Sequence, residues 1–183
     1  MSDWLTAIDN DTQACVLVTV ALVEGSGPRE AGAKMRVTTR GQLDTIGGGH
    51  LELRAVEIAK TMLVTGNTQA RLERFALGPS LGQCCGGVVW LAFEPVDASL
   101  AAVLAALRER RQQDSWRLTA LDGAAAAALF DAAGKLIAGT GDQAPDTFSR
   151  ERGAHVAQGM EGRRWLVDPC LAPRAHLTLF GAG

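Results

Sequence analysis

Glycines gather in three short clusters along this chain, and the third cluster carries two adjacent cysteines. The 183 residues include 21 glycines, concentrated at 25–32, 47–49 and 78–87. Apolar segments flank each cluster, which indicates ordered loops with demanding backbone geometry rather than disorder. Residues 76–87 read ALGPSLGQCCGG. Glycine lets a backbone approach a ligand and cysteine offers a soft sulfur, so this segment predicts a binding loop; the alternative is a tight turn with two small apolar fillers.

Composition is typical of a soluble globular protein. The chain is 47% hydrophobic and 21% charged, with a net charge of −2, and this balance gives no electrostatic case for binding nucleic acid. It has no apolar run of 18 residues, and its first residues, MSDWL, lack the basic start and apolar core of a signal peptide. We therefore expect a cytoplasmic protein without a membrane partner. In that compartment the four cysteines are expected to be free thiols: Cys15, Cys84, Cys85 and Cys170.

Hydrophobic periodicity predicts short strands interleaved with helices. Strands are expected over 14–23, 33–39, 69–77, 88–93, 116–121 and 164–167. Helices are expected over 3–10, 50–63 and 98–111, the last with Asp97 as its N-cap. Residues 124–128 have helical propensity, but the sequence FDAAGKL favours a hairpin between 126–130 and 135–138. The predicted class is α+β, with a mixed or antiparallel sheet and several helices.

The domain organisation is expected to change near the end of the chain. We expect one domain over 1–172, with an internal boundary near 95–97, and a linker marked by Pro169 and Pro173. The last eight residues, HLTLFGAG, are typical of the first strand and opening glycines of a dinucleotide-binding domain. Residues 173–183 are therefore predicted to be a linker and the first strand of a truncated Rossmann-like domain. This motif also suggests an alternative function, a nicotinamide- or flavin-binding oxidoreductase, although the rest of the fingerprint and the ribose-binding acid are absent from the sequence.

A second candidate site is the triple glycine in TIGGGHLE, residues 45–52. Gly47, Gly48 and Gly49 come directly before the predicted helix at 50–63, where exposed amides and the positive end of the helix dipole suit an oxyanion. A plain glycine-rich turn is the alternative. The histidines at 50, 155 and 176 are scattered and suggest no catalytic dyad.

Three stretches of the sequence resemble the XdhC/CoxI family of xanthine dehydrogenase accessory proteins. They are GSGPREAGAKM at 25–35, TIGGGHLE at 45–52 and ALGPSLGQCCGG at 76–87, and they occur in the family's order. The resemblance is specific over 14–95 and looser over 96–172, and LTLFGAG at 177–183 is similar to the start of the family's C-terminal Rossmann domain. It implies a chaperone without turnover of its own. Such a protein binds the molybdenum cofactor, protects it, supports its sulfuration by a cysteine desulfurase and inserts it into apo-xanthine dehydrogenase or a related molybdenum hydroxylase, and it self-associates.

The resemblance also implies roles for particular residues. The amides at 47–49 would hold the cofactor phosphate, with positive charge from Arg29 and Lys34. A thiolate of Cys84 or Cys85 would contact molybdenum or its sulfido ligand. Gln83 would bond the pterin edge, and Glu52 would do the same or cap the helix. Two further loop residues complete the expected cofactor site: Gly86 and Gly87.

Two other function classes fit the sequence less well. A structural zinc or redox protein would require spaced cysteine pairs such as C-x-x-C, and none occurs. A pure interaction module would explain an adapter role but not the adjacent thiols.

Overall fold

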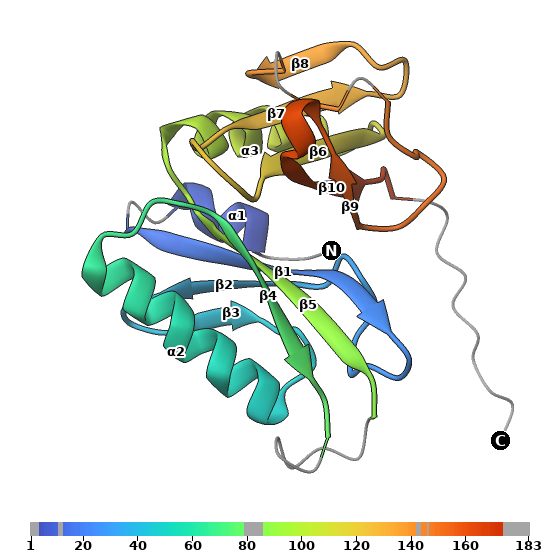
Figure 1. The fold of residues 1–183 in the computed structure, drawn as a ribbon. Coiled ribbons are helices and arrows are strands. Elements are labelled where there is room, and N and C mark those ends of the chain that lie inside the picture. Colours follow the sequence, from blue (N-terminus) through green and yellow to red (C-terminus); the bar gives the residue numbers. More distant parts are fainter. Residues whose placement is uncertain (1–3, 11–12, 79–85, 142–143, 146, 174–183) are drawn as a thin grey trace, which may run out of the picture.

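Two five-stranded antiparallel sheets, stacked on each other, form the body of the protein (Figure 1). The computed structural model describes residues 4–10, 13–78, 86–141, 144–145 and 147–173. Its elements in chain order are α1 (Trp4–Asn10), β1 (Cys15–Glu24), β2 (Lys34–Thr38), β3 (Gln42–Asp44), α2 (Gly49–Thr65), β4 (Arg71–Ala76), β5 (Val88–Pro95), α3 (Ala98–Glu109), β6 (Ser115–Ala120), β7 (Ala127–Asp131), β8 (Leu136–Gly139), β9 (His155–Gln158), the short 3₁₀ helix η2 (Met160–Gly162) and β10 (Arg164–Cys170).

The first sheet has the order β3-β2-β1-β5-β4, with the ten-residue β1 at its centre. Helix α2 covers its outer face (Figure 1). Alternate residues of β1 face this helix, where they pack with apolar residues of β2, β5 and α2: Val16, Val18, Val20, Met35, Val37, Leu51, Ala55, Ala59, Leu91 and Phe93. The intervening residues of β1 face the second sheet, so the strand is buried on both sides and reads as an apolar run.

The second sheet has the order β8-β7-β6-β10-β9 and packs on the inner face of the first. Helix α3 fills part of the space between them, where Leu17 of β1 lies in one cluster with Leu104 and Leu129. A second contact between the sheets joins Ala21 and Ala92 to Leu121 and Leu166. Trp116, Leu118 and Trp165 belong to a separate cluster on the outer face of the second sheet. Both sheets therefore share one buried interface.

The α+β class is confirmed, with two antiparallel sheets where the sequence suggested one. The predicted hairpin is present as β7 and β8, and Asp97 caps α3 by accepting a hydrogen bond from the Leu100 amide at 2.8 Å. The sequence did not predict β3, β9 or η2. The expected linker residue Pro169 is instead part of β10, where it pairs with Trp116 of β6.

The chain moves from the first sheet to the second across residues 95–98, since β5 ends at Pro95 and α3 begins at Ala98. Residues 174–183, which carry the predicted Rossmann-like strand, lie outside the described residues. The Rossmann-like strand therefore stays a prediction.

Candidate functional site

The three glycine motifs meet at one end of the first sheet, where β1 ends, α2 begins and β4 is joined to β5 (Figure 1). The space around two glycines shows how closely these loops approach each other. A β-carbon at Gly87 would lie 2.2 Å from the Ser26 carbonyl oxygen and 2.6 Å from that of Glu24. A β-carbon at Gly47 would lie 2.6 Å from Pro28 Cβ. Only glycine fits at both contacts, so the loop after β1 holds the other two loops in place.

The cysteine-bearing loop begins and ends beside this junction. The Leu77 amide donates to the Gly87 carbonyl oxygen at 2.8 Å, which closes the connection between β4 and β5. Gly86 is exposed and Gly87 is buried. The predicted residues Gln83, Cys84 and Cys85 lie outside the described residues, so their predicted contacts stay predictions.

Glu52 organises the triple-glycine loop from the first turn of α2. Its carboxylate accepts hydrogen bonds from the Ile46 amide at 3.1 Å and the Gly48 amide at 3.0 Å, and also from the side chains of Thr45 and Gln42. Burial acts to raise the pKa of Glu52, but these bonds outweigh burial and hold the pKa below its ordinary value. Glu52 therefore fixes the triple-glycine loop at the start of α2, and its predicted contact with the pterin stays a prediction.

This arrangement engages two of the three amides proposed for a phosphate. The Gly47 amide donates to Thr45 Oγ1 at 3.0 Å, and the Gly48 amide donates to Glu52. Gly49 is the first residue of α2. A phosphate at these amides would compete with the Glu52 carboxylate, so the oxyanion site remains a prediction with an intramolecular competitor.

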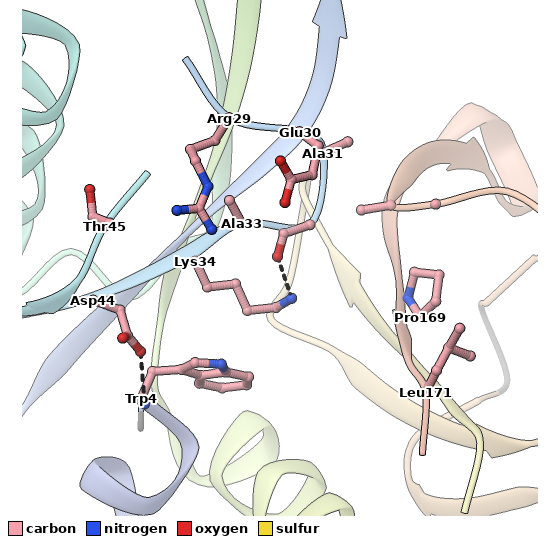
Figure 2. A pocket seen from close by; sticks show the side chains of 13 residues that line it. Trp4, Arg29, Glu30, Ala31, Ala33, Lys34, Asp44, Thr45, Pro169 and Leu171 are labelled. Atoms are coloured by element: carbon pink, nitrogen blue, oxygen red, sulfur yellow. Dashed lines mark hydrogen bonds between the residues drawn. The ribbon is translucent and has the colours of Figure 1, made fainter. Parts of the chain in front are cut away.

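Arg29 and Lys34 line one cavity of about 660 Å³ beside the motif junction. The loop between β1 and β2 forms one wall, the ends of β3 and α1 form another, and β10 with Ala154 closes the far side (Figure 2). The cavity therefore lies between elements of the first sheet and elements of the second. The two basic residues that the sequence singled out are brought together there.

Lys34 is engaged by the protein itself. Its ammonium lies 2.8 Å from Asp168 Oδ1 and donates to the Gly32 carbonyl oxygen at 2.8 Å. It also lies over the Trp4 ring, 5.6 Å from the ring centre. Only 9% of the Lys34 side chain is exposed. Its charge is thus balanced inside the wall of the cavity.

Behind Lys34, a network of buried charges joins the two sheets. Arg117 of β6 binds Glu94 of β5 at 2.5 Å and Asp168 of β10 at 3.0 Å, and all three side chains are fully buried. Thr19 of β1 donates to Glu94 at 2.8 Å. With Lys34, the network holds two cations and two anions, so its formal charge is zero. Buried charges are tolerated when they are paired and hydrogen-bonded in this way.

Titration of the network reflects these pairings. Burial acts to raise the pKa of Asp168, but the charges of Lys34 and Arg117 outweigh burial and hold that pKa below its ordinary value. Burial and the nearby Asp168 carboxylate raise the pKa of the Cys170 thiol to about 12. Cys170 is therefore a protonated, weakly reactive thiol at neutral pH. It and Cys15 are thiols rather than halves of a disulfide, as predicted.

Sequence reasoning missed this network although two signals were present. Thr19 and Glu94 are polar residues within otherwise apolar strands, and both are fully buried. Arg117 gave no such signal, because polar residues that alternate with apolar ones, as in β6, are typical of a strand with one face in solvent. Asp168 stands next to Pro169, where the sequence predicted a linker.

Two of the three histidines lie among the described residues. His155 is a buried histidine whose Nδ1 lies 2.9 Å from the Gly153 carbonyl oxygen, and His50 is exposed at the start of α2. Within the described ranges, no three His, Cys, Asp or Glu side chains are grouped so as to hold a metal ion. In the same ranges, none of the helices combines the length and apolar character that crossing a bilayer requires.

Fold and site together define a class: an α+β protein of two stacked antiparallel sheets, with glycine-loop motifs converging beside a cavity between the sheets. Residues 9–76 match the family described as the XdhC and CoxI family, which confirms the resemblance over that segment. The segment includes two of the three motifs, those at 25–35 and 45–52. The third motif, at 76–87, begins where the match ends.

A solved structure shares the fold. It is the crystal structure of a xanthine dehydrogenase from Bacillus halodurans, and it aligns with a TM-score of 0.72 at 21% identity. The alignment covers 94% of this chain and 53% of that protein, so the chain spans about half of its length. No curated protein sequence matches the chain significantly.

Proposed function

We propose that this chain is a cytoplasmic molybdenum cofactor chaperone. It holds the cofactor, protects it, supports its sulfuration by a cysteine desulfurase, and inserts it into apo-xanthine dehydrogenase or a related molybdenum hydroxylase. It has no turnover of its own and works as a homodimer. The family match over residues 9–76 supports an accessory role toward xanthine dehydrogenase.

The observation that carries the proposal is the convergence of the three motifs at one end of the first sheet. Gly47 packs against Pro28 and Arg29, while Gly87 packs against Glu24 and Ser26. Segments that are far apart in sequence thus form one surface. That surface joins a guanidinium, glycine backbone and the two ends of a loop bearing adjacent thiols.

These groups suit the chemistry of the cofactor. Its phosphate fits the Arg29 guanidinium, which can bind it through two parallel hydrogen bonds. Its dithiolene-bound molybdenum is a soft centre that prefers sulfur, so a Cys84 or Cys85 thiolate is proposed to contact the metal or its sulfido ligand. Gln83 is proposed to bond the pterin. In this scheme Glu52 supports the loop rather than the ligand, because it already accepts bonds from two loop amides.

Cofactor retention tests the proposal. The purified chain is mixed anaerobically with molybdenum cofactor, free ligand is removed by gel filtration, and bound pterin and molybdenum are assayed. We expect wild-type protein to retain both. The double variant Cys84→Ser/Cys85→Ser is expected to lose molybdenum, and Arg29→Gln is expected to weaken retention about tenfold or more, as for loss of a charged hydrogen bond.

Arg40→Gln is the matched control for the arginine. Arg40 is an exposed residue between β2 and β3, at the opposite end of β2 from the motif junction. Its variant should retain cofactor at the wild-type level. Failure of the wild-type chain to retain cofactor contradicts the proposed function, and wild-type retention by the cysteine variant contradicts the thiol role.

The oxidoreductase alternative rests on the glycine pair Gly181 and Gly183, which lies outside the described residues. Nothing among the described residues favours it.

A further inference from the structure

The cavity beside the motif junction presents one free cation and one free anion from the same loop. Arg29 and Glu30 both line it, and Figure 2 shows their side chains entering from one wall. Within the described part of the chain, neither side chain makes a hydrogen bond or an ion pair. Lys34, on the same wall, is held by Asp168 and Gly32. Arg29 and Glu30 are therefore the charged groups left available to a ligand on this wall.

The rest of the cavity is suited to a flat ring. Ala31, Ala154, Pro169 and Leu171 give it apolar surface, and the Trp4 indole lies at its end (Figure 2). Its volume of about 660 Å³ is within the range of pockets that take small organic ligands. Such pockets combine apolar walls with a few polar groups that fix the orientation of the ligand.

We propose that this cavity binds a planar heterocycle with a 2-amino-4-oxopyrimidine edge and an attached phosphate. That edge presents two neighbouring N–H donors, one on the ring and one on the amino group. The two oxygens of the Glu30 carboxylate accept both in parallel, since an ionised carboxylate is acceptor-only. The Arg29 guanidinium pairs with the phosphate.

The proposal deepens the proposed function and rests on it for the source of the ring. A pterin carries this edge, and so the cavity would hold the pterin end of the molybdenum cofactor. A guanine nucleotide carries the same edge and a phosphate. The cavity is proposed to recognise this edge and the phosphate, which both ligands share. Experiment distinguishes the pterin from the guanine nucleotide.

The test is equilibrium binding to the full chain with two probes. Phosphorylated 6-hydroxymethylpterin is titrated by its own fluorescence, and guanosine monophosphate is titrated by calorimetry. In Glu30→Gln, the new amide presents an N–H group to an N–H donor of the ligand. We therefore expect the dissociation constant of each probe to be about tenfold or more higher for this variant than for wild type. Arg29→Gln is expected to weaken binding of the phosphorylated pterin by a similar factor. Its dissociation constant for unphosphorylated 6-hydroxymethylpterin should stay within about twofold of the wild-type value.

Two matched controls separate local effects from general ones. Glu57→Gln changes an exposed carboxylate on α2, and Arg40→Gln changes an exposed guanidinium between β2 and β3. Both should bind each probe within twofold of wild type. Pterin binding that depends on Glu30 supports the cofactor as the source, whereas guanosine monophosphate binding that depends on Glu30 supports a nucleotide.

Failure of this inference is distinguishable from failure of the proposed function. If the wild-type chain retains molybdenum cofactor and Glu30→Gln retains it equally, the cavity assignment is overturned while the chaperone proposal stands. If the chain retains no cofactor but binds guanosine monophosphate through Glu30, the chaperone proposal fails and the cavity assignment stands. Binding of neither probe by wild type overturns the cavity assignment.

Discussion

The absence of a side chain at Gly87 sets how closely two motif loops approach each other. The space that a β-carbon would need is filled by backbone, namely the carbonyl oxygens of Ser26 and Glu24. Backbone atoms cannot move aside as the end of a flexible side chain can. The contact is therefore a strict steric requirement, and it links the Gly-Ser-Gly-Pro-Arg loop to the cysteine-bearing loop.

Replacing Gly87 by alanine should push these loops apart. We expect Gly87→Ala to lower the free energy of unfolding by about 2 kcal/mol or more, measured by urea denaturation. Gly86→Ala is the matched control, because a β-carbon there meets nothing within 4 Å. It should be nearly neutral. Equal stability of the two variants would contradict the packing described for the junction.

At the same scale, the sequence identified only part of the site. It singled out Arg29 and Lys34, which the fold brings to one cavity. It could not find Asp168, which is far from Lys34 in sequence and stands next to Pro169, where the sequence predicted a linker. The pairing depends on the second sheet stacking on the first, and no local pattern in the sequence encodes that stacking.

Among the elements, the start of α2 depends on a side chain from within the helix. Glu52 bonds the amides of Ile46 and Gly48, and thereby fixes the triple-glycine loop. A carboxylate here is also favoured by the positive end of the helix dipole. Both interactions require the ionised form of Glu52.

Glu52→Gln should therefore lower stability by about 1 kcal/mol at neutral pH, as for loss of a charged hydrogen bond that an amide partly replaces. The pKa of Glu52 lies below its ordinary value of 4.5 in the folded state. Its contribution is complete above that ordinary value and is lost as the pH falls through the depressed folded pKa. Urea denaturation at neutral and acidic pH should show the difference between wild type and variant shrinking on acidification.

Glu57→Gln serves as the comparison. Glu57 is on the same helix, but its side chain is half exposed and its partner is Arg54. Exposed pairs of this kind contribute little, so its variant should stay close to wild type at every pH. A difference for Glu52→Gln that does not depend on pH would show that the carboxylate charge does not hold the loop.

The elements that the sequence missed share a physical cause. Strand β3 has three residues, all exposed, and becomes a strand by pairing with β2. Strand β9 lies in a polar stretch and is fixed by pairing with β10. Pro169 is tolerated in β10 because β9 pairs only with Arg164–Val167, which leaves β10 with an open edge beyond that point. By contrast, long apolar segments such as β1 and α2 carry their own signal and were predicted within about two residues.

At the scale of the whole molecule, the two sheets are joined by a charge network as well as by apolar packing. Arg117 is its centre, since it binds Glu94 of the first sheet and Asp168 of the second. Lys34 extends the network to the wall of the cavity. The relative position of the sheets, and so the shape of the cavity, depends on these pairs.

Removing one member of such a network leaves a buried charge without its partner, which costs about 3–5 kcal/mol. We expect Arg117→Met to be destabilised to that extent. We expect the double variant Arg117→Met/Glu94→Gln to lose about 2 kcal/mol less free energy of unfolding than the sum of the losses in Arg117→Met and Glu94→Gln. The reason is that Lys34 and Asp168 remain as a balanced pair in the double variant. Urea denaturation of the four proteins gives this coupling free energy.

The exposed pair Arg164 and Asp122 provides the reference cycle. Their side chains are 43% and 36% exposed, and solvent screens their charges. The same cycle, with Arg164→Met and Asp122→Asn, should give a coupling below about 1 kcal/mol. If the buried cycle gave no more than the exposed one, the sheets would be held by apolar packing alone.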